Sequence, residues 1–213
     1  MLNYLKCKEL FSFNSVFFQK IFDAFDYPWE ILPHLREIID TIIEQGIDGY
    51  DKIGDNVLVG KNVNISKTAL IEGPSIIGAN TEIRHCAYLR GTVIIGDGCV
   101  IGNSTEIKTS VLMNGAQAPH FNYVGDSVLG ERAHLGAGVI CSNLRSDKQS
   151  VTIRTEGKKI DTGLRKFGAI LADDTEIGCN TVLCPGTVVG KNAALYPLTL
   201  ARGYYPPGSI IKA

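Results

Sequence analysis

The stretch from Ile71 to Ile107, IEGPSIIGANTEIRHCAYLRGTVIIGDGCVIGNSTEI, places an aliphatic residue at every sixth position. The repeat continues beyond this stretch in both directions. Its members are Ile53, Val59, Ile65, Ile71, Ile77, Ile83, Leu89, Ile95, Ile101, Ile107 and Met113, and it returns at Leu171, Ile177, Leu183, Val189 and Leu195. Small or β-branched residues follow four positions after each aliphatic residue, from Val57 to Val111. Such regularity indicates a repeated structural unit.

A repeat of six residues matches neither the 3.6-residue period of an α-helix nor the two-residue alternation of a half-buried strand. It fits a solenoid of short parallel strands in which each face directs one aliphatic side chain inward. Glycine, as at Gly78 and Gly96, relieves backbone strain at the narrow corners. Three hexapeptides make one triangular coil of about 18 residues. The sequence therefore predicts a mainly β fold, a left-handed parallel β-helix, which is an exception to the right-handed crossover rule.

The first 50 residues follow a different pattern. Apolar residues at Leu32, Leu35, Ile38, Ile39, Ile42 and Ile43 have the spacing of an amphipathic helix that ends at Gly46. FNSVFFQKIFDAF, residues 13–25, also has a helical pattern, and Pro28 breaks the chain between the two. We therefore expect a short N-terminal helical arm or cap over residues 1–50 and the β-helix over residues 51–213.

Length and composition limit the classes of function. A net charge of −1 over 213 residues gives no electrostatic case for nucleic acid or an anionic membrane as a partner. No apolar run reaches the roughly 18 residues that a membrane helix requires, and the N-terminus is a poor secretory signal. The cysteines are scattered, which predicts small buried side chains in a reducing, cytoplasmic setting. They are Cys7, Cys86, Cys99, Cys141, Cys179 and Cys184.

The six-residue repeat fails within KTSVLMNGAQAPHFNYVGDSVLG, residues 108–130. After Met113 the expected aliphatic position holds Pro119, and two five-residue steps then lead to Val124 and Leu129. His120 lies at this failure. A lone histidine is often structural, but a neutral imidazole can also accept a proton from an amine or hydroxyl at neutral pH. Both roles stay open on these grounds alone.

A second departure, residues 142–168, fits no hexapeptide and predicts a loop on one face of the solenoid. It is rich in basic residues: Arg145, Lys148, Arg154, Lys158, Lys159, Arg165 and Lys166. One interpretation is a solvated hairpin with ordinary surface charge. The other is a clamp for the phosphates of a substrate or of coenzyme A.

The segment APHFNYVGDSVLGERAHLGAGVICSNLR, residues 118–145, resembles the acetyltransferase half of bifunctional N-acetylglucosamine-1-phosphate uridyltransferases. The similarity is closest to the archaeal sugar-1-phosphate nucleotidylyltransferase/amino-sugar acetyltransferases and covers the chain from about Pro28 onward. YPWEIL, residues 27–32, resembles the linker that follows their nucleotidyltransferase domain, and nothing in this sequence resembles that domain itself.

This resemblance implies an acetyl-CoA-dependent N-acetyltransferase acting on glucosamine- or galactosamine-1-phosphate in nucleotide-sugar biosynthesis, without a metal. His120 matches the general base that acts on the amine as it attacks the thioester. Asn143 matches an asparagine near the amine and the acetyl carbonyl. Arg90 and Lys108 match the basic ligands of the sugar phosphate, and Tyr123 matches the tyrosine beside that phosphate.

The coenzyme side of the site is also implied by the resemblance. Gly136 and Ala137 match the backbone beside the thioester, where amides could stabilise an oxyanion. Lys148 and Cys179 are assigned to coenzyme binding, although the family's lysine aligns with Gln149. His134 stands where bacterial enzymes have a substrate-contacting asparagine. Further departures include Leu144 in place of a bacterial tyrosine.

Fold-level analogy predicts a parallel homotrimer with clefts between subunits. One alternative function is a non-catalytic trimeric scaffold, or a sugar-phosphate-binding partner of a separate nucleotidyltransferase. Another is a metal-dependent hydratase like the γ-class carbonic anhydrases, for which His85 and His120 are suitably separated but the third ligand position is Gly125. Residues 204–207, Tyr-Tyr-Pro-Pro, either cap the last coil or lie beside the adenine of coenzyme A.

Overall fold

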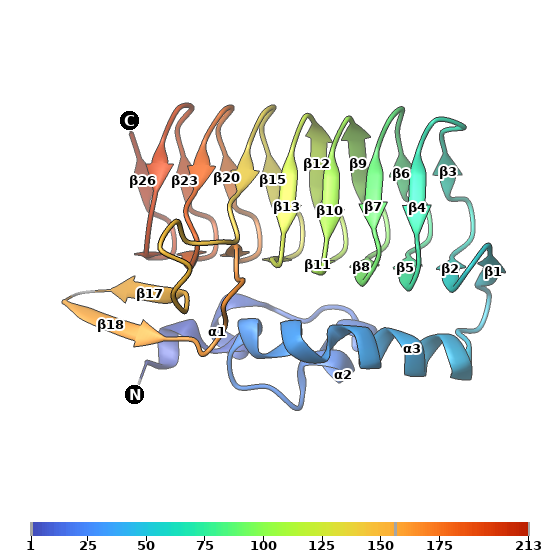
Figure 1. Cartoon of the computed structure of the whole chain (residues 1–213), viewed down its shortest axis with the longest axis horizontal. Coiled ribbons are helices and arrows are strands. Elements are labelled where there is room, and N and C mark those ends of the chain that lie inside the picture. Colours follow the sequence, from blue (N-terminus) through green and yellow to red (C-terminus); the bar gives the residue numbers. More distant parts are fainter. Residues whose placement is uncertain (1, 156, 213) are drawn as a thin grey trace.

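The repeated aliphatic side chains point into the interior of a three-sided, left-handed parallel β-helix (Figure 1). This is a computed structural model, and it describes residues 2–155 and 157–212. Each coil contributes one short strand to each of three parallel sheets, here called sheets A, B and C. The predicted fold class is therefore confirmed.

Sheet A contains β1 (Asp51–Ile53), β2 (Val57–Val59), β5 (Ser75–Ile77), β8 (Val93–Ile95), β11 (Ser110–Leu112), β14 (Val128–Leu129), β19 (Ala169–Leu171), β22 (Thr187–Val189) and β25 (Tyr204–Tyr205). Sheet B contains β3 (Asn64–Ile65), β6 (Glu82–Ile83), β9 (Val100–Asn103), β12 (Gln117–His120), β15 (His134–Leu135), β20 (Glu176–Ile177), β23 (Ala194–Leu195) and β26 (Ile210–Ile211). Sheet C contains β4 (Leu70–Glu72), β7 (Tyr88–Arg90), β10 (Glu106–Lys108), β13 (Tyr123–Gly125), β16 (Ile140–Cys141), β21 (Val182–Leu183) and β24 (Leu200–Ala201).

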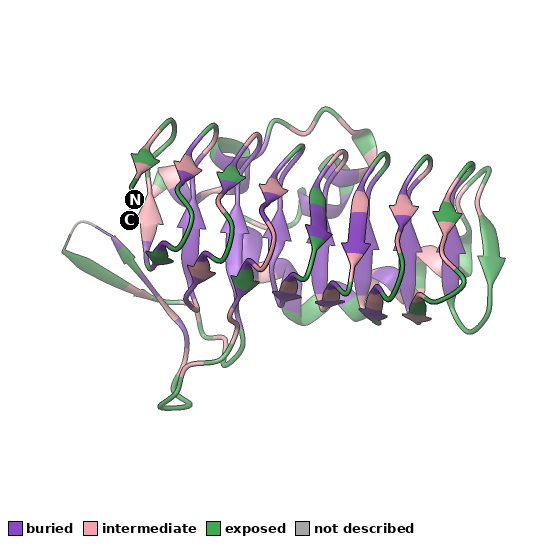
Figure 2. Ribbon diagram, turned by 90° about the horizontal axis from the view of Figure 1, so that it is seen from above, coloured by how far each residue is buried: buried purple, intermediate pink, exposed green. Residues whose placement is uncertain are grey.

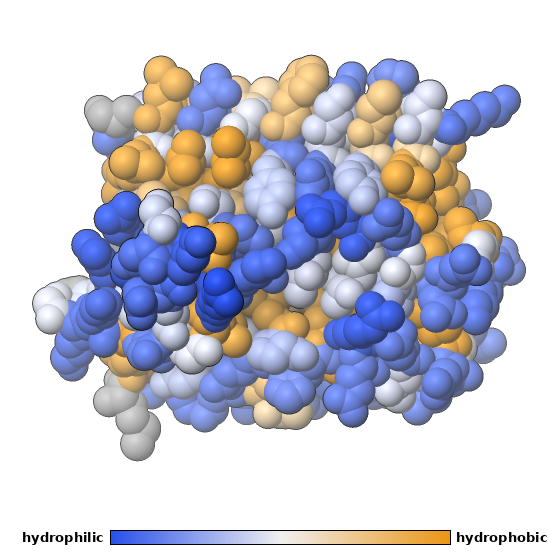
Figure 3. Space-filling model, viewed as in Figure 1, coloured by the Kyte–Doolittle hydropathy of each residue, from blue (hydrophilic) through white to orange (hydrophobic). Residues whose placement is uncertain are grey.

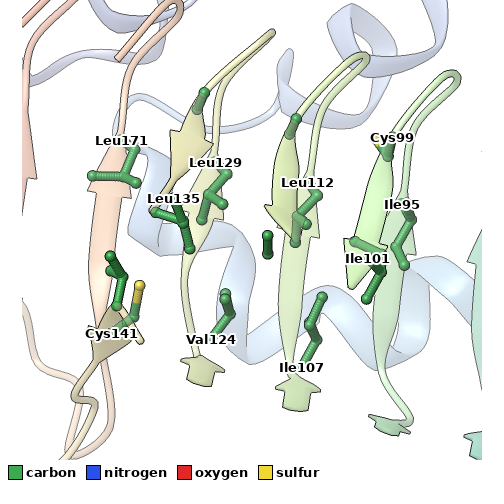
Figure 4. Close-up of a cluster of buried hydrophobic side chains, with 14 of the residues drawn as sticks. Ile95, Cys99, Ile101, Ile107, Leu112, Val124, Leu129, Leu135, Cys141 and Leu171 are labelled. Carbon is green, nitrogen blue, oxygen red and sulfur yellow. The ribbon is translucent and has the colours of Figure 1, made fainter. Parts of the chain in front are cut away.

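The interior of the β-helix is a continuous stack of aliphatic side chains (Figure 4). Most of the predicted inward positions are confirmed, but the two ends of the first series are wrong. Ile53 lies in β1, which pairs antiparallel with β2, and its side chain is 41% exposed. At the other end Leu112 points inward, whereas Met113 and Val111 pack outside the β-helix.

Coil length varies at only one of the three corners of the described coils. The A–B and B–C corners always advance the inward position by six residues, as from Leu112 to Ala118 and on to Val124. The C–A corner advances it by five from Ile107 to Leu112 and from Val124 to Leu129. The predicted short step from Val124 to Leu129 is confirmed. The predicted short step from Pro119 to Val124 is wrong, because the inward residue is Ala118, and the other short step is the earlier one that ends at Leu112. The basic insertion leaves from this same C–A corner.

The N-terminal segment lies along the outer surface of sheet A rather than over an end of the β-helix (Figure 1). Its helices are η1 (Asn3–Leu5), α1 (Cys7–Leu10), α2 (Val16–Phe22), η2 (Pro28–His34) and α3 (Leu35–Gln45). Helix α3 ends as predicted at Gly46, whose positive φ of 74° suits glycine. No helix among the described residues is long and apolar enough to cross a membrane.

Sheet A differs from the other two sheets because the aliphatic side chains on its outer face are buried. Leu58, Ile76, Ile94, Val111, Val128, Ile170 and Val188 pack with the N-terminal segment in a second hydrophobic cluster. Figure 2 shows the resulting contrast between buried strands and exposed turns. The N-terminal segment therefore supplies the outer layer that this apolar sheet face requires.

The insertion forms a loop followed by an antiparallel hairpin of β17 (Thr152–Thr155) and β18 (Lys158–Asp161). Val151 and Ile153 are fully buried in the second hydrophobic cluster, so the base of the hairpin is fixed to the β-helix. Of residues 204–207, Tyr204 and Tyr205 form β25, and Tyr205 packs against the C-terminal end of the core.

The predicted burial of every cysteine is wrong for two of them. Cys86 and Cys179 are exposed, and both lie at the B–C corner. All six cysteines are free. Burial raises the pKa of the thiols of Cys7, Cys99 and Cys141 to about 12.

Candidate active site

His120 ends strand β12 at the B–C corner, and its side chain is exposed. The buried side chain of Asn122 fixes this corner. Its Oδ1 accepts the His120 backbone N–H at 3.1 Å, and its Nδ2 donates to the Gly136 carbonyl at 2.8 Å. Phe121 bridges the two in a left-handed conformation with φ of 53°. The backbone that carries His120 is therefore held rigidly while the imidazole stays open to solvent.

Ala137 and Cys179 lie on the two coils that follow His120, at the same corner. The His120 carbonyl accepts the Gly138 N–H at 3.0 Å, and the Ala137 carbonyl accepts the Asn180 N–H at 2.8 Å. Successive coils are about 4.8 Å apart, the spacing of hydrogen-bonded strands. The structure thus brings the expected base and the residues expected near the coenzyme into one line.

Gly136 allows its coil to pack closely against the next coil, which carries Cys179. A Cβ atom at Gly136 would lie 2.7 Å from the Cys179 amide nitrogen and 2.9 Å from the Ile177 carbonyl oxygen. Both distances are shorter than real contacts of a Cβ atom, so any larger residue would push the coils apart. This is a backbone reason for glycine at a position that the resemblance places beside the thioester.

A second group of polar residues occupies the C–A corner. The Lys108 ammonium lies 3.0 Å from an Asp126 carboxylate oxygen, and the two side chains are only 16% and 9% exposed. Asn143 donates through Nδ2 to the same Asp126 carboxylate. Asp126 therefore joins two residues that the resemblance assigns to the substrate, Lys108 and Asn143.

Tyr123 adjoins this polar group from strand β13. A Cβ atom at Gly125 would lie 2.7 Å from the Tyr123 hydroxyl and 2.8 Å from Asn143 Nδ2, so glycine is required for these two side chains to meet over it. Burial, with the nearby carboxylates of Glu106 and Asp126, raises the pKa of Tyr123. The phenol therefore stays protonated and can donate a hydrogen bond at neutral pH.

Arg90 is paired in the same way one coil earlier. Its Nη1 lies 2.6 Å from Glu106 Oε1, and this hydrogen bond raises the pKa of the guanidinium. The sequence did not predict the carboxylates Glu106 and Asp126 as site residues. The available signal was their spacing, since each follows its basic partner by about one coil. Arg90 and Lys108 therefore meet a ligand as ion pairs rather than as free cations.

His134 lies on sheet B, apart from Arg90, Lys108 and Tyr123. Its Nδ1 is 2.8 Å from Glu176 Oε2. Together with Gly136 and Cys179 it lines a shallow cavity of about 340 Å³ at the B–C corner. Within this chain His134 is thus grouped with the expected coenzyme residues and not with the expected phosphate ligands.

Lys148 is exposed in the insertion loop with a left-handed φ of 59°. It follows Asp147, which binds Arg145. His85 lies at the B–C corner with Thr68 Oγ1 at 2.7 Å and the Cys86 sulfur at 3.3 Å. Across residues 2–155 and 157–212, no group of three potential ligands is arranged to hold a metal ion.

The left-handed β-helix places the chain in the structural class to which hexapeptide-repeat acetyltransferase domains belong. Residues 71–188 match the family model described as the GMPPB C-terminal domain, and the chain belongs to this family.

Several relatives are also similar to this chain. The bifunctional sugar-1-phosphate nucleotidylyltransferase/acetyltransferase of Sulfurisphaera tokodaii is 36% identical over 182 residues, covering 80% of this chain and 43% of the relative. GlmU of Methanocaldococcus jannaschii is 34% identical over 171 residues, covering 78% of this chain and 41% of the relative. The chain thus spans less than half the length of these two proteins.

The uncharacterized acetyltransferase YaiX of Escherichia coli is 35% identical over 173 residues, with coverage of 81% of this chain and 73% of YaiX. Among solved structures, a variant of the N-acyltransferase AntD from Bacillus cereus, in complex with dTDP and coenzyme A, has a TM-score of 0.47 and 20% identity. That match covers 79% of this chain and 87% of AntD.

Proposed function

We propose that the protein transfers the acetyl group of acetyl-CoA to the amine of an amino-sugar 1-phosphate. The observation that carries the proposal is the placement of His120. Its exposed imidazole, at the end of strand β12, shares a corner with Gly136 and Ala137 and precedes Tyr123, the first residue of strand β13. The relative from Sulfurisphaera tokodaii is a bifunctional sugar-1-phosphate nucleotidylyltransferase/acetyltransferase, which supports this acceptor class.

In the proposed reaction the His120 imidazole accepts a proton from the sugar amine as the nitrogen attacks the thioester carbonyl carbon. The carbon–sulfur bond of the tetrahedral intermediate then breaks. The departing thiolate takes up the proton, which leaves an N-acetyl sugar and free coenzyme A. Backbone amides near Gly136 and Ala137 would stabilise the oxyanion, and Asn143 would orient the amine or the acetyl oxygen.

The phosphate of the acceptor would bind near Arg90, Lys108 and Tyr123. Because Glu106 and Asp126 already neutralise the two cations, a phosphate must share them with these carboxylates. The Tyr123 hydroxyl, protonated at neutral pH, would add a neutral donor. Lys148 and Cys179 complete the proposed coenzyme side. His134, which the resemblance assigns to the acceptor, lines the same cavity as Gly136 and Cys179 and would meet the acceptor there, apart from its phosphate.

Thiol release tests the proposed function. The protein is incubated with acetyl-CoA and either glucosamine-1-phosphate or galactosamine-1-phosphate while free coenzyme A is followed. We expect release with one of them, and a loss of about 10²- to 10⁴-fold in His120→Ala, the usual contribution of a general base. His85→Ala, which removes an imidazole two coils away on the same corner, should retain activity. Absence of release with both acceptors would reject the proposal.

We further propose that the active form is a homotrimer in the cytoplasm. Sheet A is covered by the N-terminal segment, so the surfaces left for neighbours are sheets B and C. Exposed aliphatic side chains gather over the C-terminal coils there (Figure 3). They include Ile140, Leu198 and Leu200, which are 41%, 72% and 69% exposed. Six free cysteines are in keeping with a reducing compartment.

A further inference from the structure

A groove of about 350 Å³ lies between the insertion and the C–A corner of the coils that follow it. Arg145 and Arg154 line it from the insertion, and Arg202 lines it from the corner after β24. Ser142 and Leu144, which flank Asn143, also belong to its wall. The groove therefore begins beside the candidate active site and extends toward the C-terminal coils.

Only one of the three guanidinium groups in the groove is neutralised. Arg145 binds Asp147 through two hydrogen bonds, of 2.9 Å from Nε and 2.5 Å from Nη2, and this pair holds the pKa of Asp147 well below its usual range. Asp147 is the one carboxylate among the described residues that line the groove. Neither Arg154 nor Arg202 forms an ion pair within the described chain.

Glycines at the C–A corner allow close packing of the backbone segments that carry Arg154 and Arg202, the two arginines without an ion pair; Arg202 Nη2 lies 3.8 Å from the Cys184 sulfur. A Cβ atom at Gly203 would lie 2.4 Å from the Arg154 carbonyl oxygen, so the backbone of strand β17 rests directly on the coil that carries Arg202. Gly186 has the same role in the preceding coil, where a Cβ atom would lie 2.7 Å from the Thr152 carbonyl oxygen. Both glycines have positive φ values, of 86° and 81°. The fold thus packs the segments that carry Arg154 and Arg202 against each other, and both residues line the same groove.

We propose that this groove is a binding site for a diphosphate group, held between the Arg154 and Arg202 guanidinium groups with Arg145 at its edge. A guanidinium binds phosphoryl oxygens through paired hydrogen bonds, and an anion between two such groups removes their mutual repulsion. Diphosphates occur both in coenzyme A and in nucleoside-diphosphate sugars. Binding of a diphosphate can be measured whether or not the protein transfers acetyl groups. The proposal therefore does not depend on the proposed function.

Calorimetric titration of the full chain with inorganic pyrophosphate tests the site directly. We expect saturable binding that weakens as salt is raised. Arg154→Gln and Arg202→Gln should each weaken it by at least about tenfold, the effect of losing one charge-assisted contact. Arg36→Gln removes an exposed guanidinium of helix α3 with the same change in net charge, and it should bind as the unaltered protein does.

Arg154→Lys keeps the charge but loses the paired geometry, and we expect an affinity between those of the unaltered protein and Arg154→Gln. Circular dichroism and thermal melting establish that each variant is folded. Absence of pyrophosphate binding by the unaltered protein, or equal affinity in Arg154→Gln and Arg36→Gln, would overturn the proposal whatever the acetyl-transfer assay shows.

Competition against pyrophosphate then distinguishes the two sources of the diphosphate. Displacement by coenzyme A but not by pantetheine, which lacks the diphosphate, would assign the groove to the coenzyme. Displacement by a nucleoside-diphosphate amino sugar but not by the sugar 1-phosphate would assign it to a larger acceptor. Either result supports a diphosphate site, and displacement by pantetheine or sugar 1-phosphate alone would contradict it.

Discussion

Asp126 is the residue on which the polar group at the C–A corner depends. Its carboxylate is the shared partner of Lys108 and Asn143, and its backbone has a left-handed φ of 47°. A nearly buried ammonium without its counter-ion is unstable, so loss of this carboxylate affects the folded state as well as the site.

We expect Asp126→Ala to lower the free energy of unfolding by about 3 kcal/mol, because it leaves the Lys108 charge buried and unpaired. The matched change Glu106→Ala breaks the neighbouring pair with Arg90, whose side chains are 43% and 33% exposed, and should cost less than about 1 kcal/mol. Urea denaturation of both variants measures the difference. Equal destabilisation by the two substitutions would contradict the greater energetic cost expected for the more buried Lys108–Asp126 pair.

The cysteines give a second residue-scale prediction. Because Cys86 and Cys179 are exposed and the pKa of three buried thiols is raised to about 12, two of the six cysteines should react promptly with a thiol reagent at neutral pH. The other four should react only after denaturation. Mass spectrometry of the labelled peptides identifies the sites. Prompt labelling of Cys141, which is fully buried, would contradict the core packing.

Single residues of the candidate site were predicted by resemblance rather than by the repeat. His120, Arg90, Lys108 and Asn143 lie at corners, where a six-residue pattern says only that the side chain faces outward. The pattern contains no information on pairs formed between coils, and this is why Asp126 was missed. Its distance from Lys108 along the chain becomes meaningful only once the coil length at that point is known.

At the scale of elements, the N-terminal helices were predicted but their packing surface was not. A signal was present in the sequence. Ile76–Ile77 and Ile94–Ile95 place two aliphatic residues in a row, one for each side of sheet A. Met113 was predicted to point inward, but Leu112 does so instead. Val111, Leu112 and Met113 are all apolar, and periodicity alone cannot choose between them.

Truncation of an outward isoleucine of sheet A tests this packing. Ile94→Ala should lower the free energy of unfolding by about 2–4 kcal/mol, because the side chain is fully buried beneath the N-terminal segment. Ile210→Ala, on strand β26, removes the same atoms from a side chain that is 63% exposed and should cost about 0.5 kcal/mol or less. A similar small cost for Ile94→Ala would mean that the segment does not cover sheet A in solution.

For the whole molecule, the exposed aliphatic side chains over the C-terminal coils predict self-association. Sedimentation equilibrium should give three times the 23.1 kDa mass of one chain. Leu200→Asp, on strand β24, should shift the population toward the monomer, since a buried charge at an interface between copies is costly. Lys20→Asp, on helix α2 and outside sheets B and C, is the control and should leave the trimer intact. A monomer at all concentrations would contradict this prediction.

The confinement of length variation to the C–A corner has a consequence for protein engineering. The A–B and B–C corners keep a six-residue step between inward positions in every described coil. The third corner already accommodates steps of four, five and six residues and a hairpin-bearing insertion. Foreign loops could therefore be grafted at this corner while His120, on the constant B–C corner, keeps its place.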